Sequence, residues 1–228
     1  MADGGSRLMK LHGGPSLTGG IKCITETEAD KMALAEAEIA PKILTYEDYL
    51  REGEINQRYD IIDGVRIFYM ASPSIPHQEY GINVLELLRA YQRQTRRGRT
   101  LNAPLDILVS RFPLRTRQPD VLFISAERLQ EAGGNHADVP LTVAPEIVVE
   151  VLSGSDTRRV RAEKIADYCL IGVNERWLVS PEGETVEVLR LTPEGPVREA
   201  LYGSGQTLQS LTFPDMTLAL DDIFRIEE

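Results

Sequence analysis

Cysteine is scarce in this chain: its 228 residues include only Cys23 and Cys169. Two cysteines build no disulfide framework and no metal-ligand pattern, which favours a reducing, cytoplasmic setting. Apolar runs are short, and none approaches the ~20 residues that a membrane-crossing helix needs. The start of the chain lacks the basic head and apolar run of a secretory signal. We therefore expect a cytoplasmic protein without a membrane span.

The sequence also lacks several motifs that identify enzyme classes. It contains no glycine-rich phosphate loop, no nucleophile elbow and no zinc-binding pattern. Its net charge of −10 argues against a general nucleic-acid coat. Any chemistry must therefore come from side chains that lie far apart in the sequence.

Positive charge is concentrated in one segment, from Arg89 to Pro119, which carries eight arginines and a single acid. The eight, called here the arginine stripe, are Arg89, Arg93, Arg96, Arg97, Arg99, Arg111, Arg115 and Arg117. The stripe is suited to phosphates if it lies on one face. The simpler interpretation, which the sequence favours slightly, is a solvated helix end followed by a polar loop.

The chain divides near residue 40 into two parts of different composition. Residues 1–20 are rich in glycine and have no periodicity, and residues 25–40 form at most an appended Ala/Glu-rich helix. We expect residues 1–40 to be a flexible extension and residues 41–228 to be the folded domain.

Hydrophobic periodicity predicts an α/β or α+β domain in which helices flank a mixed β-sheet. The expected helices lie at 45–52, 77–97 and 156–171, and the expected hairpins at 59–70 and 176–189. Further strands are expected at 105–109, 121–124, 147–152, 197–202 and 217–220. The Asp63-Gly64 dipeptide marks the turn of the first hairpin.

Polar side chains in the segment from Pro119 to Lys164 predict a binding site for a hard metal ion. Glu150 lies inside an apolar strand, so it must reach water, a cation or a metal. An ion pair with Arg158 or Arg159 is an equally good interpretation. Asp120 taken alone is an ordinary residue at the start of a strand. Paired with Glu150 it completes the two carboxylates that suffice for Mg²⁺.

Lys164 shares a helical stripe with Val160 and Tyr168, at the edge of the apolar face. Its ammonium either extends to solvent or points over the strand ends toward Glu150. His77 and Glu79, at the start of a helix, are weaker candidates, because most such residues only cap the helix. Asp106 lies inside an apolar strand and has the same two interpretations as Glu150.

These residues belong to an ordered set that resembles a known family. The set is Tyr59–Gly64, Ser72-Pro73-Ser74 with His77, Pro104-Leu105-Asp106, Pro119-Asp120-Val121, Val149–Ser153, Lys164 with Tyr168, Gly172-Val173 and Trp177–Val179. It resembles the bacterial Uma-type restriction endonucleases, a branch of the PD-(D/E)XK nuclease superfamily, over residues 41–224. The family usually has Glu where Asp60 stands, a departure that we place outside the expected site.

The resemblance implies a restriction-endonuclease-like core and a Mg²⁺-dependent hydrolase acting on DNA, with Mn²⁺ as an alternative ion. By position, Asp120 and Glu150 are the motif acids, and the Val151 carbonyl assists them with the metal. The superfamily lysine normally lies two residues after the second acid, where this chain has Leu152. Lys164 takes that role from the next helix.

The leading hypothesis is thus a DNA endonuclease, expected to be a homodimer because cutting two strands needs two sites. The alternative is a non-catalytic module that keeps the fold to bind nucleic acid or protein. We further expect Arg93, Arg96, Arg97 and Arg115 to be exposed, and some of them to lie on the same side as the acid pair.

Overall fold

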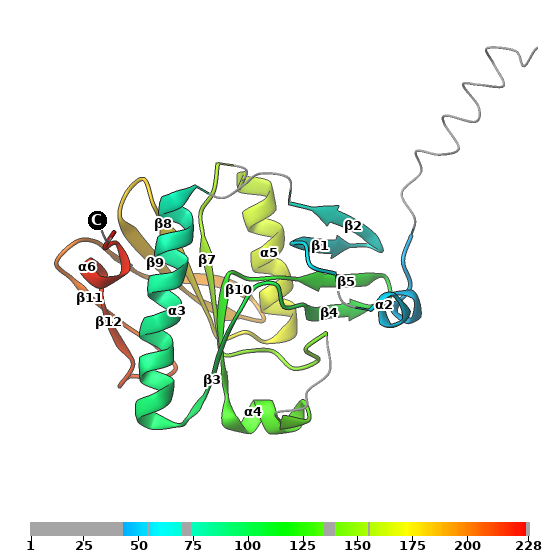
Figure 1. Cartoon of the computed structure of the whole chain (residues 1–228), viewed down its shortest axis with the longest axis horizontal. Helices are drawn as coiled ribbons and strands as arrows, with labels where there is room; N and C mark the ends of the chain where they lie inside the picture. Colours follow the sequence, from blue (N-terminus) through cyan, green and yellow to red (C-terminus); the bar gives the residue numbers. More distant parts are fainter. Residues whose placement is uncertain (1–42, 54, 70–73, 135–139, 155, 227–228) are drawn as a thin grey trace, which may run out of the picture. The chain divides into compact units, whose positions relative to one another are not determined.

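The computed structural model describes residues 43–53, 55–69, 74–134, 140–154 and 156–226 (Figure 1). These residues belong to one unit, Pro41–Glu228. The expected N-terminal extension and its helix at 25–40 lie outside the described residues.

Helices of the described chain are α2 (Tyr46–Glu52), α3 (Ile75–Thr95), α4 (Ala126–Glu131), α5 (Arg158–Ile171) and α6 (Leu220–Ile223). The first strands are β1 (Tyr59–Ile62), β2 (Val65–Phe68), β3 (Gly98–Asn102), β4 (Ile107–Arg111), β5 (Leu114–Arg117) and β6 (Val121–Ser125). The remaining strands are β7 (Ile147–Val151), β8 (Glu175–Ser180), β9 (Thr185–Thr192), β10 (Gly195–Tyr202), β11 (Thr207–Gln209) and β12 (Thr217–Ala219).

The central sheet has six strands in the order β10-β9-β8-β7-β6-β3. Its β7–β8 pair is parallel, and its other pairs are antiparallel. Helix α3 covers one face and α5 the other, because Val84 and Leu88 share a core cluster with Val149 while Tyr168 shares one with Val148. The predicted α/β (α+β) class, a mixed sheet flanked by helices, is confirmed.

A second, four-stranded sheet with the order β2-β1-β5-β4 lies beside the first. Its β1–β2 hairpin turns at Asp63 and Gly64, both with positive φ (51° and 80°), as the dipeptide predicted. Strand β5 was not predicted, because its sequence Leu-Arg-Thr-Arg reads as a polar loop. This sheet brings the residues around Arg58 and Asp60 close to the start of β6.

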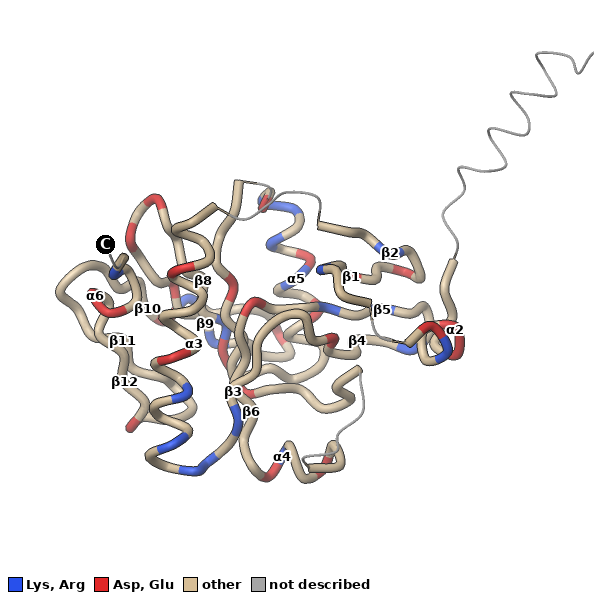
Figure 2. Tube along the Cα trace, in the orientation of Figure 1, with Lys and Arg blue, Asp and Glu red and all other residues tan. Residues whose placement is uncertain are grey.

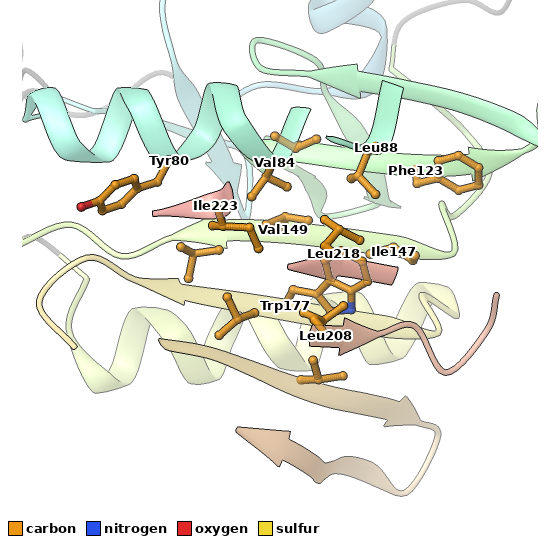
Figure 3. Close-up of a cluster of buried hydrophobic side chains, with 14 of the residues drawn as sticks. Tyr80, Val84, Leu88, Phe123, Ile147, Val149, Trp177, Leu208, Leu218 and Ile223 are labelled. Atoms are coloured by element: carbon orange, nitrogen blue, oxygen red, sulfur yellow. The ribbon is translucent and has the colours of Figure 1, made fainter. Parts of the chain in front are cut away.

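The largest apolar cluster lies between α3 and the central sheet (Figure 3). Val84 and Leu88 of α3 are fully buried against Val149 of β7 and Trp177 of β8. Because strand side chains alternate, Glu150 points to the opposite face, toward α5. One strand thus supplies the core on one face and the candidate site on the other.

Both ends of α5 are fixed by residues with known capping roles. The Thr157 side chain accepts a hydrogen bond from the Val160 N–H, and Gly172 ends the helix in the left-handed conformation at φ 86°. Fixed ends set the rotation of α5 and therefore the direction of Lys164. Within the described residues, no helix combines the length and the apolar character required to span a membrane.

Candidate functional site

Asp120 and Glu150 lie side by side on neighbouring strands of the central sheet. Antiparallel β6 and β7 pair Val121 with Val149, so the next position in this register places Asp120 opposite Glu150. Directly opposed side chains share a face of the sheet, with Cβ atoms ~5 Å apart. The Val151 N–H also donates to Asp120 Oδ2 at 2.7 Å, which fixes the carboxylate at the end of β7.

Glu150 is bound by two side chains from α5. The Lys164 ammonium donates to Glu150 Oε2 at 2.7 Å, and the Tyr168 hydroxyl donates to Oε1 at 2.7 Å. The two residues are one helical turn apart, so they reach the same carboxylate, as the predicted stripe requires. The alternative ion pair with Arg158 or Arg159 is wrong, since Arg159 pairs with Glu163 and Lys164 is the cation at Glu150.

Glu150 and Lys164 stabilise each other's charged forms despite their burial. Burial by itself raises the pKa of Glu150, but Lys164 and Arg176 outweigh it and the net direction is down. Burial lowers the pKa of Lys164, but Glu150 and Asp60 outweigh this and raise it. The site therefore holds a carboxylate and an ammonium at neutral pH.

Asp120 has a cationic partner that the sequence did not reveal. Arg58 Nη1 lies 2.5 Å from Asp120 Oδ1, and Arg58 Nη2 donates to the Gln118 carbonyl at 2.8 Å. His77 Nε2, at the start of α3, lies 4.0 Å from Asp120 Oδ2. His77 thus lies beside the acid pair, whereas Arg58 was missed because it lies 62 residues from Asp120 and matches no motif.

Tyr69 connects the two cations of the site. Its ring centroid lies 5.4 Å from the Arg58 guanidinium carbon and 5.6 Å from Lys164 Nζ. Its hydroxyl donates to Asp60 Oδ2 at 2.6 Å. The expectation that Asp60 lies outside the site is therefore wrong: the Asp60 carboxylate helps to raise the pKa of Lys164 and holds Tyr69 in place.

A buried ion-pair network supports this arrangement from the second sheet. Arg117 is bound by Asp60 at 2.7 Å and by Asp167 at 2.6 Å. Asp167 also pairs with Arg115 at 2.8 Å. These contacts attach β1 and β5 to α5, so the hairpin that carries Arg58 is held in a fixed position.

Asp106 and Glu79 do not join the acid pair. Asp106 accepts hydrogen bonds from the Tyr49 and Tyr59 hydroxyls at 2.7 and 2.8 Å, away from the acid pair. In the described part of the chain, Glu79 forms no hydrogen bond or ion pair with Asp120 or Glu150.

The arginine stripe does not form one surface at the site. Arg93, Arg96 and Arg97 are exposed as expected, but they lie at the C-terminal end of α3, where Figure 2 shows basic segments. His77 marks the end of α3 near Asp120, so those arginines are roughly 25 Å away along the helix. The expectation for Arg115 is wrong, because its side chain is only 17% exposed and pairs with two acids.

The chemistry of the acid pair fits a hard divalent cation. Each carboxylate accepts two of roughly four hydrogen bonds that it can take, so both keep free lone pairs. In the described residues, no cluster of three or more His, Cys, Asp or Glu side chains is positioned to hold a metal. Mg²⁺ needs only one or two carboxylates and keeps several waters, so Asp120, Glu150 and the Val151 carbonyl suffice.

Comparisons with known proteins identify the family and the fold. The model of the Uma2 family, described as "Putative restriction endonuclease", matches residues 45–221. A crystal structure from Anabaena variabilis, described as a putative nuclease belonging to DUF820, superposes with a TM-score of 0.65. It is 19% identical and the match covers 79% of this chain and 97% of that one, which shows a shared fold. None of the curated proteins matches the chain.

Proposed function

Since the chain belongs to the Uma2 family, the resemblance stated from its sequence is confirmed, and we propose that it is a Mg²⁺-dependent endonuclease that hydrolyses phosphodiester bonds in DNA. The observation that supports this most is the placement of Asp120 opposite Glu150, with the Lys164 ammonium 2.7 Å from Glu150. Two acids and a lysine at one strand end are the groups that phosphodiester hydrolysis requires.

Asp120, Glu150 and the Val151 carbonyl would hold the ion. A bound Mg²⁺, or Mn²⁺ in its place, supplies a Lewis acid for the scissile phosphate and lowers the pKa of a water bound to it. The protein's part is to keep both acids ionised and fixed. Tyr168 fixes one Glu150 oxygen, and the Val151 N–H fixes one Asp120 oxygen.

Lys164 stabilises the negative charge that develops on the phosphate during attack. Its ammonium carries three N–H donors, and one of them is directed at Glu150. The other two donors would bind phosphate oxygens when the substrate reaches this ammonium, whose side chain is 5% exposed. The lysine is oriented before substrate arrives, so little reorganisation is needed during the reaction. In this way Lys164 replaces the lysine that is absent at Leu152.

We further propose the substrate, the assembly and the cellular location of the protein. The substrate is DNA, and the protein acts in the cytoplasm. It acts as a homodimer, because cleavage of both DNA strands requires two sites. Analytical ultracentrifugation tests the dimer, and a monomer that cuts both strands contradicts it.

The proposal is tested by incubating the protein with supercoiled plasmid DNA and Mg²⁺. We expect nicked and linear products, loss of cleavage with EDTA and recovery with added Mg²⁺ or Mn²⁺. A protein that leaves a range of DNA substrates uncut with either ion contradicts the proposal.

The alternative, a non-catalytic binding module, is favoured by one observation. Each acid already has a cation beside it, Arg58 at Asp120 and Lys164 at Glu150. A structural role for these pairs predicts DNA or protein binding that is unchanged by EDTA, together with no cleavage.

A further inference from the structure

Arg58 has fewer carboxylate partners and more exposure than Arg117, an arginine with a purely structural role. Its Nη1 contacts the Asp120 oxygen that no backbone N–H occupies, and its side chain remains 33% exposed. Arg117, by contrast, is bound by two carboxylates and is 3% exposed. Arg117 is locked, whereas one carboxylate and one carbonyl hold Arg58 at the solvent-facing side of the site.

The Arg58 guanidinium places its positive charge at the Asp120 carboxylate, where a metal ion would place its own. Burial lowers the pKa of Arg58, but Asp120 and Glu150 outweigh it and raise the pKa, so the guanidinium lies in the field of both acids. Asp120 Oδ2 accepts the Val151 N–H, which leaves Oδ1 as the oxygen that faces incoming cations. A guanidinium and a divalent ion at the same oxygen repel each other.

Tyr69 gives Arg58 an alternative resting place. The guanidinium carbon already lies 5.4 Å from the ring centroid, close enough for a cation–π contact. Lys164 Nζ lies 5.6 Å from the same ring. A guanidinium that leaves Asp120 but stays on Tyr69 would share that ring with the Lys164 ammonium. The two cations would then form a clamp for one phosphate group, and the planar fork of arginine suits two phosphate oxygens.

We propose that Arg58 substitutes for the divalent cation at Asp120 in the metal-free protein and transfers to the substrate phosphate when the cation binds. The inference rests on the proposed nuclease function and adds a residue that is both a competitor of the metal and a ligand of the substrate. Arg58 keeps the acid pair neutralised before the ion arrives, which limits repulsion between two carboxylates on opposed positions. It then contributes to catalysis from its second position.

Arg58→Met tests this role, because it keeps the length of the stem and removes the charge. We expect calorimetry without DNA to show that Mg²⁺ binds the variant about tenfold more tightly than the parent. This factor corresponds to the free energy of one charge-assisted hydrogen bond, which Mg²⁺ must break at Asp120 in the parent but not in the variant. Plasmid cleavage at saturating Mg²⁺ should fall by about tenfold or more. Tighter metal binding with slower cleavage is a combination that damage to the fold does not produce, since damage weakens both.

Arg66→Met is a matched control from the same hairpin. Arg66 also pairs with an acid, Glu52 at 2.7 Å, and its guanidinium carbon also lies over a tyrosine ring, Tyr59 at 4.7 Å. It touches neither Asp120 nor Glu150. We expect Arg66→Met to match the parent in both Mg²⁺ affinity and cleavage.

Arg58→Lys covers the case in which Arg58→Met does not fold. Lysine keeps the charge without the fork, so Mg²⁺ affinity should stay near the parent's while cleavage falls severalfold. The inference is overturned if Arg58→Met binds Mg²⁺ no more tightly than the parent, or if Arg58→Lys cleaves like the parent. If either result is found while the parent still binds Mg²⁺ and cleaves DNA, only the inference about Arg58 is wrong and the proposed nuclease function is retained. Absence of Mg²⁺ binding in the parent removes both proposals together.

Discussion

Two buried glutamates on neighbouring strands have surroundings of different kinds. Glu175 begins β8 and faces the α3 side of the sheet, where its donors are neutral. The Trp177 indole N–H, the Ser210 hydroxyl and the Thr212 N–H bind it at 2.9, 2.7 and 2.5 Å. Three donors share its two oxygens, and the residue is fully buried.

Glu150, near the end of β7, faces α5 and has a cation and a second acid beside it. Lys164 and Tyr168 take one hydrogen bond on each oxygen, and Asp120 occupies the opposed position on β6. The comparison shows that burial of a carboxylate does not by itself identify a site. A set of neutral donors around a buried carboxylate indicates a structural role, whereas a charged partner and a second acid at a strand end indicate chemistry.

Glu150→Gln should have the largest effect, because it removes a metal ligand. We expect Mg²⁺ affinity to fall and cleavage to be lost, by more than ~10³-fold, in protein that circular dichroism shows to be folded. If Glu150→Gln cleaves DNA at the parent's rate, Glu150 is not a catalytic residue and does not differ from Glu175 in role.

Lys164→Met should reduce cleavage by ~10²–10³, as the loss of one preorganised donor does. Glu150 keeps the Tyr168 hydroxyl and the nearby charge of Arg176, so Mg²⁺ should still bind. Single-turnover cleavage and calorimetry measure the two effects separately. Equal cleavage by the variant and the parent contradicts the role of Lys164.

Glu175→Gln is the same substitution on the structural side of the comparison. Its amide nitrogen cannot accept the N–H that one carboxylate oxygen accepts, so a buried donor is left unsatisfied. Stability should fall by about 1–3 kcal/mol, which lowers Tm by several degrees. Mg²⁺ affinity, measured by calorimetry on the folded variant, should not change. A change in metal binding would show that the two sides are coupled.

Arg176→Met should have the smallest effect, with the opposite sign. Arg176 is 1% exposed, and its Nε and Nη1 have no hydrogen-bond partner among the described residues. Relief of these two unsatisfied buried N–H groups should outweigh the loss of the Arg176 charge near Glu150, so the stability should rise by about 1 kcal/mol in a denaturant titration. Arg117→Met is the matched contrast, and it should lose about 3–5 kcal/mol, because the buried Asp60 loses its arginine and the buried Asp167 keeps only its pair with Arg115 among the described contacts.

Local signals predicted the parts of the structure that depend on neighbours in sequence. The Asp63-Gly64 turn, the apolar strand at Ile147–Val151 and the helical stripe of Lys164 and Tyr168 were all foreseeable, since each follows from a turn type or a period. Strand β5 was not, because Arg117 looks solvated until Asp60 and Asp167 are brought to it.

The missed parts of the site have the same cause. Arg58 and Tyr69 flank a hairpin and meet Asp120 and Lys164 only after the second sheet docks beside the first. Glu175 was missed because nothing in its sequence neighbourhood distinguishes it from an exposed glutamate. Partners that are 60 residues away leave no periodic trace in a single sequence.

The central claim, that Asp120 and Glu150 share one catalytic divalent ion, is tested most directly by crystals grown with Mn²⁺ and measured for anomalous scattering. We predict one strong peak at ~2.0–2.2 Å from an oxygen of each carboxylate, with the Arg58 guanidinium no longer on Asp120 Oδ1. Crystals that show both acids still paired with Arg58 and Lys164 and no anomalous peak between them, at Mn²⁺ concentrations that support cleavage, would contradict the claim.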